Sequence, residues 1–150
     1  MNNVERLERA RHFFSMIPHG NALGFEVVAA EENAVIVRLP YREDLIGDRR
    51  TRQIHGGALV TLVDQTSGAA VICTLDEPEA VATLDLRVDH LRPAEAGRDV
   101  FARAECYRVA RNIAFVKCRV YDDDASDPVA TSMSSFMRAS STKGNMFAGK

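Results

Sequence analysis

One segment of the 150-residue sequence restricts the possible folds more than any other. From Gly57 to about Thr74 nearly every residue is apolar or small, and the stretch is longer than a typical strand. It therefore predicts a helix that is buried on most of its sides. One sheet covers only part of such a helix, so we expect a second copy of the chain to cover the rest.

Short runs of apolar and β-branched residues lie on both sides of this helix. Two precede it, at residues 25–30 and 34–39, and four follow it, at residues 80–91, 99–109, 113–121 and 128–138. Short connections join the last four, which is typical of antiparallel neighbours. Together with an amphipathic helix at residues 4–17, this order predicts an α+β fold in which one antiparallel sheet wraps a long central helix.

The length fits one domain, which we place at residues 1–139, followed by a flexible tail at residues 140–150 that is rich in Ser, Lys and Gly. A net charge of −2 argues against nucleic acid as the main partner. The stretch at residues 41–53 is polar and predicts a long mobile loop of the kind that often carries function.

The three cysteines, Cys73, Cys106 and Cys118, have no metal-ligand spacing and are odd in number. We therefore expect neither a disulfide framework nor a metal site, and no redox cofactor. The N-terminal segment has no apolar run of signal-peptide length, and no segment approaches the roughly 20 apolar residues that cross a bilayer. We expect a cytoplasmic protein with no membrane partner.

His55, Gly56 and Gly57 stand where the apolar helix begins. Two glycines at a helix start let backbone N–H groups approach a ligand closely, and the helix dipole favours a negatively charged oxygen there. This is the outline of an oxyanion hole. The alternative is that the two glycines only form a tight entry to the helix, with His55 packed nearby.

Asp64 lies within the same helix and shares a face with the small residues Gly57, Thr61 and Gly68. This face leaves room for a cleft in front of a carboxylate that acts as a general base; the alternative is a solvated stripe. Eight residues separate Gly56 from Asp64, which is about 12 Å along a helix and too far for both to act on one carbonyl. We therefore expect a homodimer or homotetramer in which two chains form each site.

The run from His55 to Asp64 resembles the signature of hotdog-fold acyl-CoA thioesterases of the phenylacetate-pathway (PaaI-like) type, and residues 91–97 are similar to the segment that closes the family's next strand. The resemblance covers residues 24–138. It implies a thioesterase that hydrolyses acyl-CoA to the free acid and CoA. It also implies that the Gly56 amide polarises the thioester carbonyl, that Asp64 of the partner acts as base or nucleophile, and that Thr83 orients the attacking water.

Strict alternation along the strand at residues 80–91 places Thr83 with Asp85 and Arg87, opposite the residues that face the apolar helix, Leu84 and Leu86. Thr83 therefore reaches the helix side only if the strand contains a bulge or if a cleft opens at the dimer seam.

Five further residues are candidates for binding the substrate. Gln53 is the only amide shortly before His55, where relatives place an amide that contacts the thioester carbonyl. Arg92, Arg108 and Arg111 lie at strand ends or turns from which cations reach CoA phosphates, although each is also interpretable as a solvated surface charge. His90 completes the set.

Two other functions compete with hydrolysis. A non-catalytic acyl-CoA-binding or sensing module keeps the oxyanion cradle, but it does not need the carboxylate of Asp64. A hotdog dehydratase or hydratase needs a histidine paired with an acid in the cleft, and the sequence contains no motif of that kind.

Overall fold

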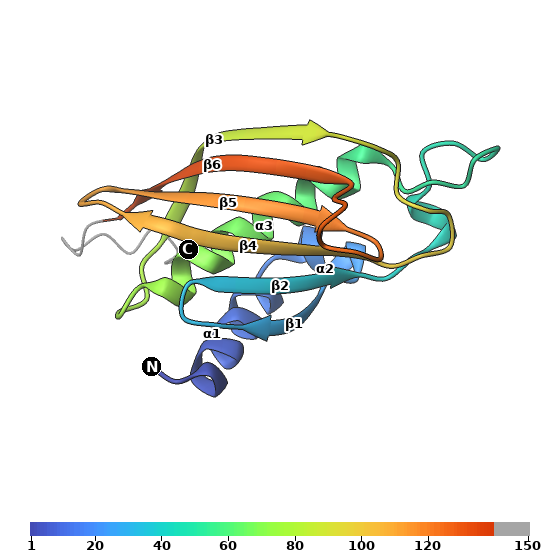
Figure 1. Cartoon of the computed structure of the whole chain (residues 1–150). Coiled ribbons are helices and arrows are strands. Elements are labelled where there is room, and N and C mark those ends of the chain that lie inside the picture. The colour runs from blue at the N-terminus through green and yellow to red at the C-terminus, as the bar shows by residue number, and fades with distance from the viewer. Residues whose placement is uncertain (140–150) are drawn as a thin grey trace.

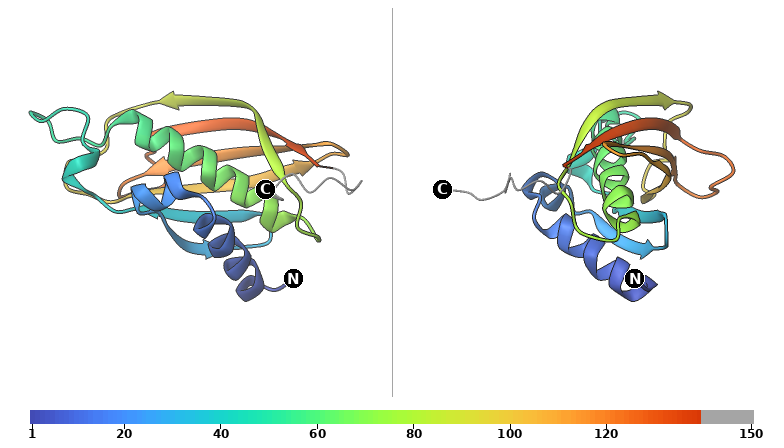
Figure 2. Two further views of the ribbon diagram at one scale, coloured as in Figure 1. Left: turned by 180° about the vertical axis from the view of Figure 1, so that it is seen from behind. Right: turned by 90° about the vertical axis from the view of Figure 1, so that its left-hand side faces the viewer.

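The computed structural model describes residues 1–139, and the predicted tail at residues 140–150 lies outside the described residues. An antiparallel sheet of six strands curves around one long helix, and two N-terminal helices pack beside it (Figures 1 and 2). The α+β arrangement predicted from the sequence is confirmed. The elements are α1 (Asn3–Ser15), α2 (Pro18–Leu23), β1 (Glu26–Ala30), β2 (Ala34–Leu39), η1 (Glu43–Leu45), α3 (Gly56–Thr74), β3 (Val81–His90), β4 (Val100–Val109), β5 (Ile113–Tyr121) and β6 (Ala130–Arg138).

The apolar segment forms α3, the central helix of the fold. Leu62, Val63 and Val71 are completely buried, and α3 packs against β2, β4 and β5 as well as against α1. Burying each side chain of this size contributes roughly 1.5–3 kcal/mol. Among the helices of residues 1–139, α3 alone is long and apolar enough to cross a membrane, and most of it is buried in the fold. Packing in a protein core accounts for its composition.

The N-terminal helix α1 is capped at its start and is held to α3 from its middle. Asn2 and Glu5 form a capping box at its start, where each side chain accepts from the backbone N–H of the other. Arg9 donates hydrogen bonds to the carbonyl oxygens of Ile72 (3.3 Å) and Leu75 (2.7 Å) at the end of α3. These contacts hold α1 along the C-terminal part of α3, where it covers one side of the candidate site.

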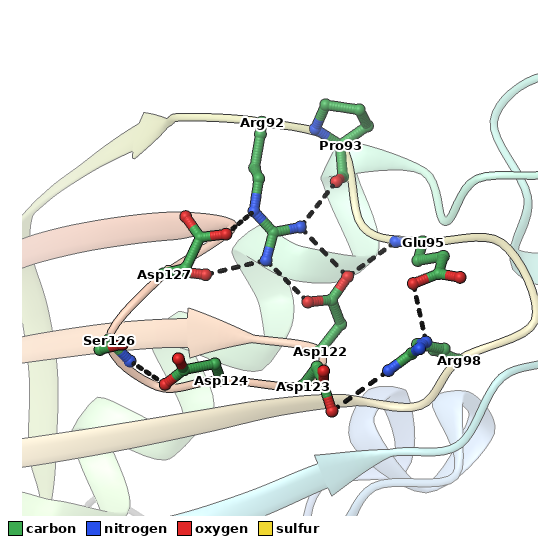
Figure 3. Close-up of polar contacts among 9 residues, drawn as sticks. All are labelled: Arg92, Pro93, Glu95, Arg98, Asp122, Asp123, Asp124, Ser126 and Asp127. Carbon is green, nitrogen blue, oxygen red and sulfur yellow. Dashed lines mark hydrogen bonds and ion pairs between the residues drawn. The ribbon is translucent and has the colours of Figure 1, made fainter.

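The strand order is β1-β2-β4-β5-β6-β3, so β3 pairs with the last strand and forms an edge of the sheet. The prediction that the last four strands are sequential neighbours is wrong for β3 and β4. The physical reason lies in residues 91–99, which cross the ends of β5 and β6, where Arg92 pairs with Asp122 (Figure 3). This anchored crossing lets a short segment join two strands that are not paired.

Residues 41–53 are more structured than a long loop. They begin with η1, and a β-bridge between Ile46 and Ile54 closes the base, where the Gly47 N–H donates 2.8 Å to the Gln53 carbonyl oxygen. Beyond this base, the tip extends away from the sheet (Figure 1).

The cysteines are free and buried, as expected for residues that fill the core. Burial raises the pKa of Cys73 to about 11 and that of Cys118 to about 12, so both thiols stay protonated and unreactive at neutral pH.

Candidate active site

The glycine pair at the start of α3 is used in two different ways. His55 is the N-cap, and its Nδ1 accepts a hydrogen bond of 2.8 Å from the Gly57 N–H. A Cβ atom on Gly57 would lie only 2.9 Å from this nitrogen, so His55 folds back closely because residue 57 is glycine. The prediction that Gly57 donates to a ligand needs correction, because its amide is already engaged in the helix cap with His55.

The N–H of Gly56 is the amide that remains for a ligand. Among residues 1–139, no acceptor lies within hydrogen-bond distance of it, and it belongs to the first turn of α3, where the helix dipole is positive. A Cβ atom on Gly56 would meet ring atoms of His90 at 3.5 and 4.0 Å. The structure therefore brings two predicted site residues together, and we call Gly56 and His90 the amide half-site.

Asp64 lies two turns further along α3 and is partly exposed. Its Oδ1 accepts a hydrogen bond of 2.8 Å from the Thr83 hydroxyl. Thr83 reaches this position because the register of β3 shifts between Thr83 and Asp85, so that Thr83 pairs with the buried Phe136. Of the two possibilities that alternation left open, the bulge is the one present. We call Asp64 and Thr83 the carboxylate half-site.

The two half-sites lie on one helix. Gly56 and Asp64 both belong to α3 and are eight residues apart, which corresponds to about 12 Å at 1.5 Å per residue. A reacting carbonyl cannot contact both groups of the same chain, since each contact requires an approach of about 3 Å. One chain therefore carries two separate half-sites.

A cavity of about 650 Å³ opens beside Asp64, between α3, β3 and the N-terminal helices. Its size is within the range of pockets for small-molecule ligands. Gly68 lies at its wall, where a Cβ atom would lie 3.6 Å from both Phe13 and Phe136. Most of the wall is apolar, as an acyl group requires. The apolar residues include Phe13, Ile17, Ile72, Val81 and Phe136.

The cavity wall contains two polar residues that the sequence did not predict for this site. Gln65 follows Asp64, and only 7% of its surface is exposed. A glutamine inside an apolar helix was the signal that could have identified it. His19 comes from α2, and its Nε2 lies 3.3 Å from the Thr61 hydroxyl. Among the described residues, the hydrogen-bond partner of His19 is therefore Thr61 and not Asp64.

Arg92 does not have the free guanidinium that the CoA-phosphate prediction requires. Its two terminal nitrogens donate to the Asp122 carboxylate at 2.8 and 3.2 Å, and further bonds reach Asp127 and the Pro93 carbonyl oxygen (Figure 3). This contact holds the pKa of Asp122 well below its ordinary value of 3.8. The prediction that Arg92 binds substrate needs correction, because its donors fix the β3–β4 connection to the β5–β6 turn.

The other predicted binding residues lie apart from the cavity. Arg108 and Arg111 are exposed around the tight β4–β5 turn, and among the described residues neither forms an ion pair. Gln53 lies at the base of the 41–53 segment, where its backbone carbonyl oxygen accepts from the Gly47 N–H. Its side chain has no hydrogen-bond partner in residues 1–139. None of these three residues lines the cavity beside Asp64.

Residues 53–129 match the family model of the thioesterase superfamily. The chain belongs to this superfamily. A crystal structure of a Pseudomonas aeruginosa protein is 44% identical in sequence, covers 89% of this chain and 99% of its own, and superimposes with a TM-score of 0.83. PaaI from the phenylacetic acid degradation operon of Escherichia coli superimposes with a TM-score of 0.81 over 93% of this chain and 97% of its own. At 18% identity it shows the shared fold, and the hotdog fold implied by the resemblance is confirmed.

Curated relatives extend the comparison. A Halobacterium salinarum protein, provisionally named as an esterase, is 37% identical over 101 residues, which are 65% of this chain and 66% of that protein. A second relative with such a name, from Haemophilus influenzae, matches over 64% of its length. Human acyl-coenzyme A thioesterase 13 is 26% identical over 112 residues, covering 75% of this chain and 74% of its own. The chain thus spans about two thirds to three quarters of the length of these relatives.

Proposed function

We propose that this protein hydrolyses acyl-CoA thioesters to a free carboxylic acid and CoA. The observation that carries the proposal is the carboxylate of Asp64, which is held by Thr83 at the wall of a mostly apolar cavity. The cavity accepts an acyl group, and the carboxylate supplies the base that hydrolysis needs. The name of human acyl-coenzyme A thioesterase 13 supports CoA esters as the substrate class.

In the proposed reaction, Asp64 removes a proton from a water molecule whose oxygen bonds to the thioester carbonyl carbon. The carbonyl electrons move to its oxygen, and the Gly56 N–H stabilises the resulting oxyanion. The C–S bond then breaks, and the CoA sulfur takes the proton that Asp64 held. Alternatively, a carboxylate oxygen of Asp64 bonds to the carbonyl carbon, the C–S bond breaks and CoA leaves as a thiolate that takes a proton from water; a water molecule then hydrolyses the resulting anhydride and restores Asp64. In both routes Thr83 orients the carboxylate by donating to Oδ1.

We further propose that two chains form each site. The edge strand β3 carries Thr83 near one end and His90 at the other. When two such edges pair antiparallel about a two-fold axis, the Thr83 end of one chain lies opposite the His90 end of its partner. The carboxylate half-site then faces the amide half-site of the second chain, and the separation of about 12 Å within one chain no longer matters.

Other parts of the sequence interpretation remain proposals. Arg108 and Arg111 are exposed cations available for CoA phosphates. We also propose a homodimer or homotetramer and a cytoplasmic location. A binding module without turnover is the competing function, and it predicts that Asp64 is dispensable.

The test measures release of the CoA thiol from short, medium, long and aryl acyl-CoA esters. Asp64→Asn should lower kcat by about 10² or more while binding and folding persist. Asp76→Asn, an exposed carboxylate just beyond α3, is the matched control and should leave kcat unchanged. Binding of all esters without release of thiol by the wild-type protein would establish the binding module instead.

A second pair of variants tests the amide. Gly56→Pro removes the N–H while keeping the helix start, because proline fits the first position of a helix and the extended backbone of His55 suits a following proline. We expect kcat to fall by about 10²–10³. Gly56→Ala adds bulk toward His90 but keeps the N–H, so it should retain most activity. Equal losses in both variants would contradict the oxyanion role.

A further inference from the structure

The side chain of Gln65 is buried without using its hydrogen-bonding capacity. Only 7% of the residue is exposed, and its Nε2 has no acceptor among residues 1–139. Its amide packs directly on Gly20 of α2, where a Cβ atom would lie within 2.2 Å of Oε1. An unpartnered buried amide destabilises a fold, and an apolar side chain of similar size would avoid that cost. Packing alone therefore does not explain a glutamine here.

Gln65 also lines the cavity beside Asp64. The polar side chains of α2 and α3 that share this wall, His19, Thr61 and Gln65, belong to the same part of the helices as Asp64. The stretch further along α3 is apolar, from Gly68 to Ile72. Glu79, the remaining charged residue of the wall, is paired with Arg138 at 2.7 Å. A ligand in this cavity thus meets polar groups near the carboxylate and apolar groups beyond them.

We infer that Gln65 is a specificity-determining residue that recognises an oxygen on the acyl chain close to the thioester. This inference rests on the proposed function, which places the thioester carbonyl at Asp64. Gln65 and Asp64 both line this cavity, and the wall along α3 is apolar from Gly68 onward, so the oxygen that Gln65 recognises lies on the carbons nearest the thioester. The substrate class is an aliphatic acyl-CoA with a hydroxyl or keto oxygen at that position, whose hydrocarbon tail fills the apolar part of the cavity. On binding, the Gln65 carboxamide turns its Nε2 from Gly20 toward the cavity, and the ligand oxygen accepts from it, so the amide gains the partner that it lacks.

The test compares decanoyl-CoA with 3-hydroxydecanoyl-CoA, which differ only in the hydroxyl group. We expect the wild-type kcat/KM to favour the hydroxylated ester by about five- to tenfold, the discrimination that one neutral hydrogen bond supplies. Gln65→Met keeps the length of the side chain but removes the donor, so the preference should vanish while decanoyl-CoA is still hydrolysed. Asn33→Leu is the control, since this exposed amide of the β1–β2 turn lies outside the cavity, and it should keep the wild-type preference.

Other results overturn the inference and separate it from the proposed function. Turnover of both esters with a ratio that Gln65→Met leaves unchanged refutes the recognition of oxygen but leaves thioester hydrolysis intact. A lower melting temperature with an unchanged ratio assigns Gln65 to packing alone. Absence of turnover on either ester refutes the proposed function and the inference with it. Calorimetric binding of both esters to Asp64→Asn, with and without Gln65→Met, measures the same ratio without hydrolysis.

Discussion

The ion pair between Arg92 and Asp122 gives a prediction that separates a structural from a substrate-binding arginine. The Asp122 side chain is only 3% exposed, and its oxygens accept from Arg92 and from the Glu95 backbone N–H at 2.8 Å (Figure 3). Arg92→Ala leaves this carboxylate buried with a single donor. Because the Arg92 side chain is itself 31% exposed, water partly replaces it, and leaving the buried carboxylate short of donors costs about 1–3 kcal/mol of unfolding free energy. For a domain of this size that corresponds to a fall in Tm of roughly 2–12 °C.

Arg98→Ala is the matched control, because Arg98 lies in the same cluster but pairs with exposed carboxylates. Its partners Glu95 and Asp123 are 64% and 77% exposed. Exposed pairs of this kind contribute less than about 1 kcal/mol. Urea unfolding should therefore show a large loss of stability for Arg92→Ala and a small one for Arg98→Ala, with KM for CoA esters unchanged in both. Equal stability of the two variants, or a raised KM for Arg92→Ala alone, would refute the structural role.

The effect of Arg92→Ala should also depend on pH. The Arg92 guanidinium lowers the pKa of Asp122 in the folded protein below its ordinary value of 3.8. A lowered folded pKa contributes stability that is present above the unfolded pKa and is lost as the pH falls toward the folded pKa. The difference in unfolding free energy between wild type and Arg92→Ala should therefore be largest at neutral pH and should shrink below about pH 4. A difference that stays constant down to pH 2 would show that Asp122 is not its source.

Three further predictions concern the site. Thr83→Val should lower kcat by roughly 10- to 100-fold, because a hydrogen bond to the Asp64 carboxylate is lost, whereas Thr83→Ser should keep most of the rate; similar rates for both variants contradict the orienting role. Gly68→Ala should raise Tm, since alanine favours a helix interior by about 1 kcal/mol and its Cβ fits at 3.6 Å from Phe13, while kcat/KM for the longest acyl chains falls. Mixed dimers of Gly56→Pro and Asp64→Asn should recover activity, because each contains one intact composite site, and complementation that never exceeds the two parents despite subunit exchange would exclude composite sites.

The central helix and the position of Asp64 on it follow directly from local sequence patterns. The run from Gly57 to Thr74 is too long for a typical strand and buries its many apolar side chains as a helix, which the structure contains as expected. The distance between Gly56 and Asp64 then follows from helix geometry alone. These features depend on residues that are close in sequence, which is why they were predictable.

Features that depend on distant partners were not predictable in the same way. Arg92 had the position of a phosphate ligand, but its partner Asp122 lies 30 residues away and meets it only because β3 pairs with β6. The sequence suggested that the Gly57 N–H was available for a ligand, but in the structure it donates to the His55 ring. In both cases the acceptor of one donor was not predictable from the local sequence. A strand pairing decides it for Arg92, and a side-chain orientation decides it for Gly57.

The bulge on β3 links the local sequence to the geometry of the site. Without the register shift after Thr83, alternation would point its hydroxyl away from α3, and the carboxylate of Asp64 would lose its donor. The same strand is the unpaired edge of the sheet and ends at His90, beside the free amide of Gly56. One edge strand therefore positions parts of both half-sites. Under the proposed pairing with a second copy about a two-fold axis, each half-site would receive the group that its own chain holds about 12 Å away. Assembly and catalysis would then depend on the same ten residues of β3.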